Sequence, residues 1–376
     1  MIASYFDKNA IFNKILRLNK NLILLVCMIF FCGLMLLYSA NNGNMKPWAI
    51  RQLLYFVCFF PVMIAIAVID LKFWLKSSYL IYIGGLFLLV LVAIIGHKSM
   101  GATRWLNLGF IRIQPSEIMK ICMTLALARY FFQNDINDIR KNKKLIIPTI
   151  MYIIPFCFIL KQPNLGTVLI LTAIFVATLF FVGVQFWKFV LCFVIALLMI
   201  PITWKYGLHD YQKQRVITFL NPESDPLNSG YNITQSKIAI GSGGIWGTGF
   251  LKGVQGQLEF LPEKHTDFIF AVLAEEFGFI GSVFVISLFL VMFIFFAYII
   301  TKCNHSYGKI IVMGVFVNIF CHFFINIGMI TGILPVVGIP LPMLSYGGSI
   351  TVSTLISIGF VLNVDINRNT ELSLLD

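Results

Sequence analysis

The sequence predicts an all-α, polytopic membrane protein with about ten transmembrane helices and one large extracytoplasmic loop between spans 7 and 8. Hydrophobic residues make up 59% of the 376 residues, and the mean hydropathy is +0.88. Charged residues make up only 12%, about half of the roughly 25% found in soluble domains. The apolar runs are long and continuous, near the roughly 20 residues that a spanning helix needs, whereas a membrane barrel would give short alternating segments.

The apolar runs define one integral membrane domain over residues 1–376, since no repeat, low-complexity tract or soluble domain interrupts them. The expected spans are residues 21–39, 53–70, 77–96, 116–133, 145–161, 165–183, 186–204, 267–300, 308–332 and 346–364. The loop at residues 205–266 alternates turn signals with aromatic and aliphatic residues. We therefore expect this loop to fold onto the membrane surface.

The distribution of lysine and arginine predicts the orientation. With the N-terminus inside, the inner tails and short loops carry fourteen of these residues and the short outer loops carry six, which favours cytoplasmic N- and C-termini. The net charge of +12 therefore reflects topology and does not indicate nucleic-acid binding. The eight cysteines lie in or beside apolar runs without a CxxC pair, so neither a disulfide framework nor a zinc site is indicated.

Residues 257–276 contain five of the sixteen acidic residues of the chain. Thr266 is expected to cap the following helix, which would place Asp267 in its first turn. A carboxylate where water meets lipid, beside Lys264 and His265, is positioned for chemistry on a membrane-bound substrate. The alternative is a capped helix with a solvated loop.

A second polar group comprises Arg104, Trp105, Glu117 and Lys120. Glu117 and Lys120 are three residues apart and share a helix face. The group fits an anion and sugar site, in which Arg and Lys bind phosphate and Trp stacks on a sugar. A structural ion pair with an interfacial tryptophan explains the same residues.

Two further patterns are less specific. Asn318, His322 and Asn326 recur every four residues on one helix face, which fits either interhelical hydrogen bonding or the lining of a polar cavity; a metal site is less favoured, because His322 has no clustered partners in the sequence. Residues 345–349 (Ser-Tyr-Gly-Gly-Ser) begin the last span, where backbone N–H groups can hold a phosphate. The glycine-rich residues 241–249 match no nucleotide-binding loop.

Four long stretches together resemble the SEDS family (shape, elongation, division and sporulation), and are more similar to its rod-shape branch than to its division branch. They are residues 101–120, 211–249, 257–276 and 326–349. The resemblance implies a peptidoglycan glycosyltransferase of the bacterial cytoplasmic (inner) membrane, which polymerises the undecaprenyl-diphosphate-linked disaccharide-pentapeptide lipid II during elongation. It also implies a class B penicillin-binding protein as partner, alongside other elongation-complex proteins. The family has an acid where this chain has Asn164, so a charge-dependent role is not expected there.

The resemblance maps the essential aspartate of the family onto Asp267, which we expect to be the catalytic base. The helix dipole and Lys264 are expected to keep it ionised. No cofactor motif is present, and a divalent cation (Mg²⁺ or Mn²⁺) is a candidate to assist the diphosphate. The expected substrate-binding residues are Arg104, Trp105, Gln114, Glu117, Lys120, Arg215, Gln257, His265, Asn326, Ser345, Gly347 and Gly348.

Other classes of function make different demands on the sequence. A flippase for the same lipid should carry polar groups deep in the bilayer or on both sides, whereas here they concentrate outside. A secondary transporter should show paired broken spans in two halves, and none is evident. A scaffold would not need Asp267.

Overall fold

A computed structural model describes residues 8–99, 102–107, 109, 112–134, 142–207, 210–221, 223, 225, 229–258 and 260–373. Its long helices are α2 (Lys20–Ala40), α3 (Trp48–Val68), α4 (Leu71–Ile95), α5 (Pro115–Gln133), α7 (Asn142–Lys161), α8 (Leu165–Val182), α9 (Phe186–Ile202), α13 (Ile269–Lys302), α14 (Ser306–Ile330) and α15 (Gly348–Ile366). The shorter ones are α1 (Lys8–Leu16), η2 (Thr203–Gly207), α10 (Asp210–Leu220), α11 (Ser229–Gly243) and α12 (Val254–Gln257).

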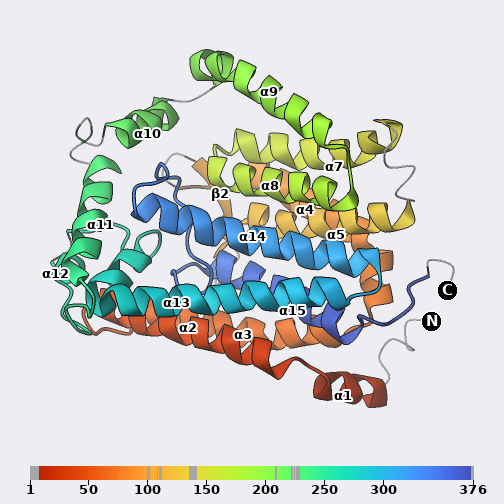
Figure 1. Ribbon diagram of the computed structural model, residues 1–376, viewed down its shortest axis with the longest axis horizontal. Helices are drawn as coiled ribbons and strands as arrows, with labels where there is room; N and C mark the ends of the chain where they lie inside the picture. Colours follow the sequence, from red (N-terminus) through yellow and green to blue (C-terminus); the bar gives the residue numbers. More distant parts are fainter. Residues whose placement is uncertain are drawn as a thin grey trace.

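The long helices run side by side, with both chain termini at one end of the bundle and α10, α11 and α12 at the other (Figure 1). We call these the termini end and the loop end. The arrangement agrees with the expected even number of passes. The loop between spans 7 and 8 is helical in part, and its α11 packs against α13 and α14.

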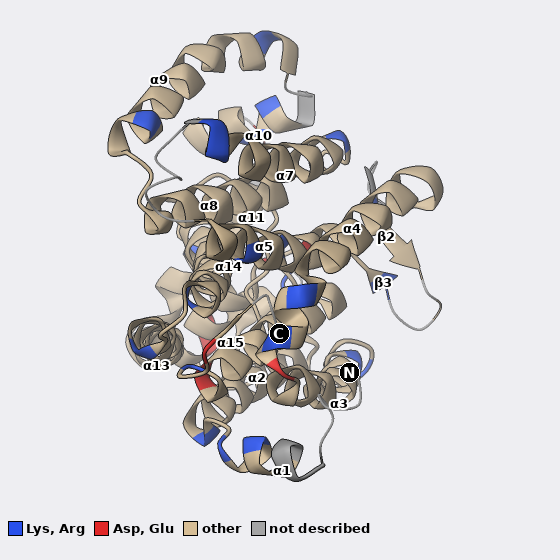
Figure 2. Ribbon diagram, turned by 90° about the vertical axis from the view of Figure 1, so that its right-hand side faces the viewer, with Lys and Arg blue, Asp and Glu red and all other residues tan. Residues whose placement is uncertain are grey.

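Within the described residues, nine helices are long and apolar enough to cross a membrane. The remaining expected span, residues 116–133, is α5, which carries Glu117, Lys120 and Arg129 and is therefore less apolar. It lies between α4, α8 and α14 (Figure 2), and most of its side chains are buried. Protein, rather than lipid, surrounds most of α5, which reduces the cost of placing its three charges within the membrane.

Two features depart from a plain bundle of buried helices. No residue of α9 is buried, and this helix stands away from the bundle (Figure 1). An antiparallel sheet of three short strands, β1 (His97–Ser99), β2 (Ala102–Asn107) and β3 (Arg112–Ile113), connects α4 to α5. The all-α prediction did not include these strands.

Helix α13 is broken at Gly278, whose backbone angles are φ 65° and ψ −157°. The glycine-rich segment at residues 243–249 forms backbone hydrogen bonds with α13 on both sides of the break. The N–H groups of Phe279 and Ile280 donate to the carbonyls of residues 244 and 245, and those of Thr248 and Gly249 donate to the carbonyls of residues 275 and 276. Interrupted backbone at membrane depth needs such internal partners, and glycines allow the two backbones to approach.

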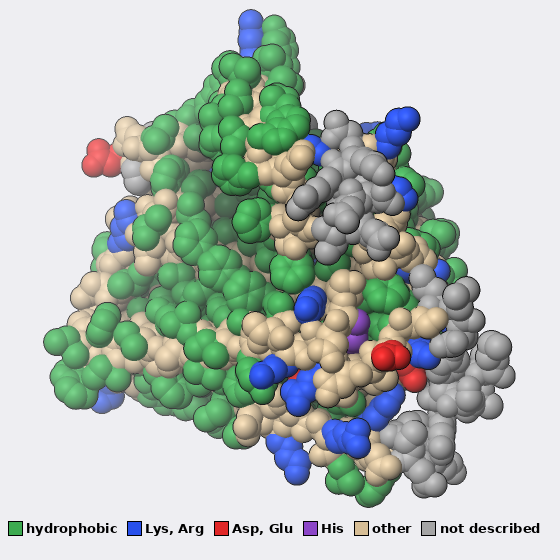
Figure 3. Space-filling model, turned by 45° about the vertical axis from the view of Figure 1, so that its right-hand side comes forward, with side chains coloured by type: hydrophobic (Ala, Val, Ile, Leu, Met, Phe, Trp, Pro, Cys, Tyr) green, Lys and Arg blue, Asp and Glu red, His purple; other side chains and the backbone are tan. Residues whose placement is uncertain are grey.

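Large hydrophobic side chains are exposed on many of the long helices, namely α2, α3, α4, α7, α8, α9, α13 and α14. In Figure 3 hydrophobic side chains cover most of the visible lateral face, whereas Lys and Arg gather toward the termini end. This distribution is the one expected of helices that contact lipid.

Candidate active site at the loop end

Asp267 lies in a turn directly before α13 at the loop end. The helix begins at Ile269, and its N-cap residue Phe268 provides no side-chain hydrogen bond. The expected capping role of Thr266 is wrong: its hydroxyl donates to the carbonyl and to the carboxylate of Glu263, at 3.2 and 2.8 Å. Asp267 therefore belongs to a hydrogen-bonded turn before the helix.

Two residues from other parts of the chain contact this turn: Asn326 through a hydrogen bond and Gly338 through close packing. Asn326 of α14 is fully buried, and its side-chain amide donates to the carbonyls of Asp267, at 2.9 Å, and Ile339, at 2.8 Å. Gly338 has a φ of 74°, and a Cβ atom there would lie 3.3 Å from Oδ2 of Asp267. A larger residue at position 338 would be strained and would crowd the carboxylate.

The electrostatic environment keeps Asp267 close to its protonation midpoint near neutral pH. The side chain is partly exposed, yet the dense surrounding protein desolvates it. Desolvation first, and then the charge of Glu263, raise its pKa to about 7, against the lowering effect of Arg215. Arg215 of α10 donates from Nη1 to the carbonyl of Val337 at 3.1 Å. The expectation that Lys264 keeps Asp267 ionised is wrong: Lys264 donates to the carbonyl of Gly256, and the cation that acts on Asp267 is Arg215.

His265 joins the Asp267 turn to the start of α3 and to the connection before α15. Its ring stacks on Trp48 with 5.0 Å between centroids, and its carbonyl accepts from the N–H of Tyr346 at 2.8 Å. Burial, aided by the charge of Lys264, lowers the pKa of His265 to about 4. The imidazole is therefore neutral at pH 7.

The glycines before α15 are held by Gln52 of α3. Its amide nitrogen donates to the carbonyl of Ser345 at 3.1 Å, and its oxygen accepts from the N–H of Gly347 at 3.2 Å. The hydroxyl of Ser345 accepts from the N–H of Leu341, and the ring of Tyr55 packs against Gly348. These contacts fix the backbone of the connection, and a phosphate-binding role for Gly347 and Gly348 stays a prediction.

Glu117, Lys120 and His322 form a buried cluster between α5 and α14. Lys120 Nζ lies 2.9 Å from Oε2 of Glu117 and 2.8 Å from Nε2 of His322. Nδ1 of His322 is 3.2 Å from the carbonyl oxygen of Pro340, and Ser353 of α15 donates to Glu117 at 3.4 Å. The ion pair expected from the sequence is present, and the expectation that His322 lacks clustered partners is wrong.

Arg104, Trp105 and Gln114 lie on the sheet side of the loop end. Arg104 of β2 donates to the carbonyls of Gln162, at 3.0 Å from Nε, and Pro163, and so clamps the turn between α7 and α8. The backbone N–H of Gln114 donates to the hydroxyl of Ser349 at 2.8 Å. Trp105 is partly exposed. The structure thus places Arg104 against a backbone turn, whereas Lys120 lies in the buried cluster. Gln257 ends α12, but its side chain lies outside the described residues.

The connection at residues 331–347 brings the site together. It accepts hydrogen bonds from Arg215 at Val337 and from Asn326 at Ile339, and its Pro340 carbonyl meets His322. Asp267, Arg215, His265 and Asn326 thus all contact this connection. The buried cluster contacts it through His322. The sequence analysis missed Gln52 and Gly338. Gln52 directly precedes the expected span at residues 53–70 and follows Arg51, so it carries no distinct signal in the sequence, and nothing local marked Gly338.

The fold and the site define a polytopic membrane protein with a partly exposed, desolvated carboxylate and a nearby cation at one end of its helical bundle. A family comparison matches residues 16–370 to the cell cycle protein family FtsW/RodA/SpoVE. The chain belongs to this family, which confirms the resemblance predicted from the sequence.

Individual relatives agree with this assignment. The chain is 37% identical over 363 residues to "Peptidoglycan glycosyltransferase MrdB" of Escherichia coli (strain K12), covering 96% of this chain and 97% of the relative. It is 35% identical over 334 residues to "Probable peptidoglycan glycosyltransferase FtsW" of Idiomarina loihiensis, covering 87% and 80%.

Two solved structures share the fold. One was described under "Structural coordination of polymerization and crosslinking by a peptidoglycan synthase complex"; it superposes with a TM-score of 0.83 at 27% identity, covering 94% of this chain and 99% of the other. Thermus thermophilus rod shape determining protein RodA superposes with a TM-score of 0.71 at 24% identity, covering 94% and 98%, and supports the fold alone.

Proposed function

We propose that this chain is a peptidoglycan glycosyltransferase of the rod-shape (RodA) branch, which polymerises lipid II into glycan strands during cell elongation. The observation that carries the proposal is Asp267: a partly exposed carboxylate with a pKa of about 7 beside Arg215, in a chain related to MrdB along nearly its whole length. A carboxyl group with this pKa is matched to general-base work near neutral pH.

The reaction joins a sugar hydroxyl to the anomeric carbon of a lipid-diphosphate donor. Asp267 takes the proton of the attacking hydroxyl as its oxygen forms the new glycosidic bond. The bond between the anomeric carbon and the diphosphate breaks, and the diphosphate leaves with its electron pair. One base suffices for this direct, inverting displacement.

The leaving diphosphate develops negative charge, which nearby cations stabilise. Arg215 is the first candidate, because its charge already acts on Asp267. Lys120 and Arg104 are second candidates, because other contacts already hold both of them. Lys120 contacts Glu117 and His322, and Arg104 donates to the turn at residues 162–163. To bind the diphosphate, each would have to share these contacts with substrate.

A divalent cation would fit beside Asp267 only if the substrate diphosphate supplied some of its ligands. No three His, Cys, Asp or Glu side chains cluster as a metal site among the described residues. Glu263, however, lies near enough to Asp267 for its charge to raise the pKa of Asp267. Magnesium commonly binds through one or two carboxylates plus substrate phosphates, so Mg²⁺ or Mn²⁺ would neutralise diphosphate charge there, with Glu263 as its protein ligand.

The partner we propose is a class B penicillin-binding protein, which would cross-link the strands; the related chain from a peptidoglycan synthase complex supports this. The surface proposed is the lateral face of α13 and α14. Phe293 and Phe296 of α13 are buried, so they do not contribute to this surface. The exposed aromatic residues on these two helices are Phe279, Phe284, Tyr298, Phe320 and Phe324.

Polymerisation of labelled lipid II by purified protein with its partner tests the proposed function. Asp267→Asn keeps size but removes basicity, so the rate should fall by about 10²–10⁴-fold, with donor binding little changed. Glu263→Gln removes the exposed carboxylate of the same turn but leaves the proposed base in place, so its effect should be milder. Wild-type protein that moves the lipid across vesicles without forming polymer would instead support a flippase.

A further inference from the structure

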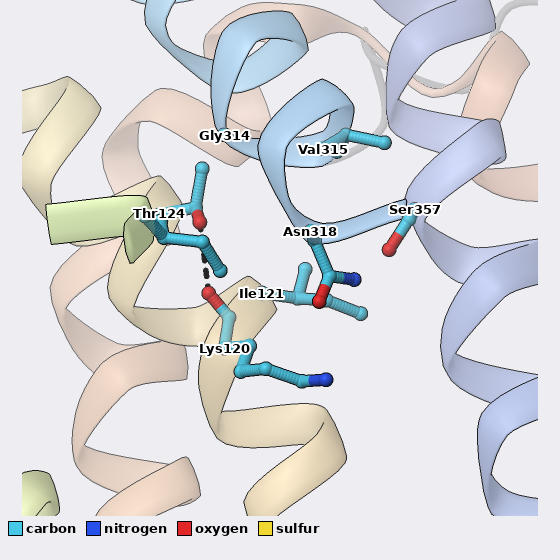
Figure 4. Close-up of a pocket in the computed structure, with 8 residues that line it drawn as sticks. Lys120, Ile121, Thr124, Gly314, Val315, Asn318 and Ser357 are labelled. Atoms are coloured by element: carbon cyan, nitrogen blue, oxygen red, sulfur yellow. Dashed lines mark hydrogen bonds between the residues drawn. The ribbon is translucent and has the colours of Figure 1, made fainter. Parts of the chain in front are cut away.

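A small polar cavity lies inside the bundle between α5, α14 and α15. Its volume is about 10 Å³, close to the space that one water molecule needs. Its polar lining residues are Lys120, Asn318, Ser357 and Thr124, and the hydroxyl of Thr124 donates to the carbonyl of Lys120 at 2.8 Å. Ile121, Ile174 and Val315 provide most of the apolar lining. Figure 4 shows Lys120, Asn318 and Ser357 on three different helices around the same space.

The hydrogen-bonding capacity of these three groups is incompletely used. The ammonium of Lys120 has three N–H donors, of which Glu117 and His322 accept two. Oδ1 of the buried Asn318 has no hydrogen-bond partner within the described part of the chain. The hydroxyl of Ser357 donates to the carbonyl of Ser353 at 2.8 Å, which leaves its oxygen able to accept.

We propose that this cavity binds one ordered water molecule that links Lys120 to Asn318 and Ser357. The water accepts the third N–H of Lys120 and donates one hydrogen to Oδ1 of Asn318 and the other to Oγ of Ser357. This gives it three hydrogen bonds, the usual number for a buried water, and satisfies a polar atom that is costly to leave unpaired.

The water makes Asn318 a positioning residue for Lys120. The ammonium is held from one side by Glu117 and His322 and from the cavity side by the water. Because Nδ1 of His322 meets the carbonyl of Pro340, the placement of Lys120 is coupled to the connection that also holds Asp267. Asn318 thus acts on the loop end only through Lys120.

An experimental density map that resolves waters tests the site directly and independently of activity. We expect one peak within hydrogen-bond distance of Nζ of Lys120, Oδ1 of Asn318 and Oγ of Ser357. A cavity without density, or a peak that contacts none of these atoms, overturns the proposal.

Three variants test whether Asn318 positions Lys120. The activity measured in this test is polymerisation, so this part of the test rests on the proposed function. Asn318→Leu removes the acceptor and should lower the polymerisation rate about tenfold, the effect of losing one hydrogen bond in a charged network. Asn318→Asp keeps an acceptor in place and should retain most activity. Ile121→Val alters only the apolar lining and should leave the rate unchanged.

A double-mutant cycle with Lys120→Met separates coupling from general damage. If the water joins the two residues, Asn318→Leu should lower the melting temperature by several degrees in the wild-type background and by much less in the Lys120→Met background. Equal shifts in both backgrounds, or equal activity losses in Asn318→Leu and Asn318→Asp, contradict the proposal. Absence of polymerisation by the wild type would reject the proposed function and leave the map and the melting cycle as tests of the water site.

Discussion

At the scale of single residues, desolvation and two charged groups, Glu263 and Arg215, set the proton affinity of Asp267. Glu263 and Asp267 share one turn, and Arg215 comes from α10. The sequence analysis correctly selected Asp267 and Arg215 but assigned the electrostatic control to Lys264. Only folding determines which cation acts on the carboxylate: Lys264 is three residues away in sequence, yet it donates to the carbonyl of Gly256.

The pH dependence of polymerisation should follow the ionisation of Asp267. Only the ionised carboxylate can take a proton, and its fraction falls as the pH drops through the pKa of about 7. The rate should therefore fall below pH 7 and level off above it. Arg215→Gln removes a charge that lowers this pKa and should move the midpoint upward, whereas Glu263→Gln should move it downward. A kcat/KM profile for each variant measures these shifts, and shifts in the same direction would contradict the assignment.

Asn326 should contribute to both stability and activity. Asn326→Leu leaves the carbonyls of Asp267 and Ile339 without their donor, at a cost of about 1–3 kcal/mol for each buried group. We expect a lower melting temperature and a lower rate per folded molecule, since the turn that bears the base is loosened.

Asn363 offers a matched control for this variant. It is equally buried and donates to the carbonyls of Ile66 and Ala67, near the termini end. Asn363→Leu should lower the melting temperature without lowering the rate per folded molecule. Equal rate losses in the two variants would show that Asn326 has no special relation to the site.

At the scale of secondary-structure elements, hydropathy predicted the spans because lipid imposes length and apolarity directly. It did not predict the start of α13 at Ile269, the break at Gly278 or the strands before α5. Each of these depends on backbone partners distant in sequence, such as the carbonyls of residues 244 and 245 that accept from α13. The glycines within residues 241–249 are explained in the same way, because this segment pairs closely with the backbone of α13.

Substitutions within this glycine segment should differ sharply. Gly247 has a φ of 81°, and a Cβ atom there would lie 2.1 Å from the carbonyl oxygen of Glu276. Gly247→Ala should therefore lower the melting temperature by several degrees and detach the segment from α13. Gly241→Ala adds a methyl group to α11 where nothing lies within 4 Å, so it should be neutral or slightly stabilising. Equal thermal stability of the two variants would contradict the docking role.

At the scale of the whole molecule, the connection at residues 331–347 joins helices that are far apart in sequence. It contacts α3 through Gln52, α10 through Arg215 and α14 through Asn326 and His322. The sequence indicated that Arg215, Asn326 and His322 were unusual, but a joining role could not be foreseen, because most of these bonds are to backbone carbonyls that carry no sequence signature.

The placement of the two ends relative to the membrane follows from charge, and it can be tested with cysteines in a cysteine-free background. Both termini share one end of the bundle (Figure 1), and the excess of Lys and Arg in the short loops there predicts that this end is cytoplasmic. Lys252 is exposed near α12, and Glu371 is exposed near the C-terminus. An impermeant maleimide should label Lys252→Cys in intact cells and Glu371→Cys only after permeabilisation. The reverse pattern would contradict the orientation while preserving the fold. Labelling of both positions from the same side would contradict the placement of these segments at opposite ends, and with it the access of Asp267 to a substrate presented outside.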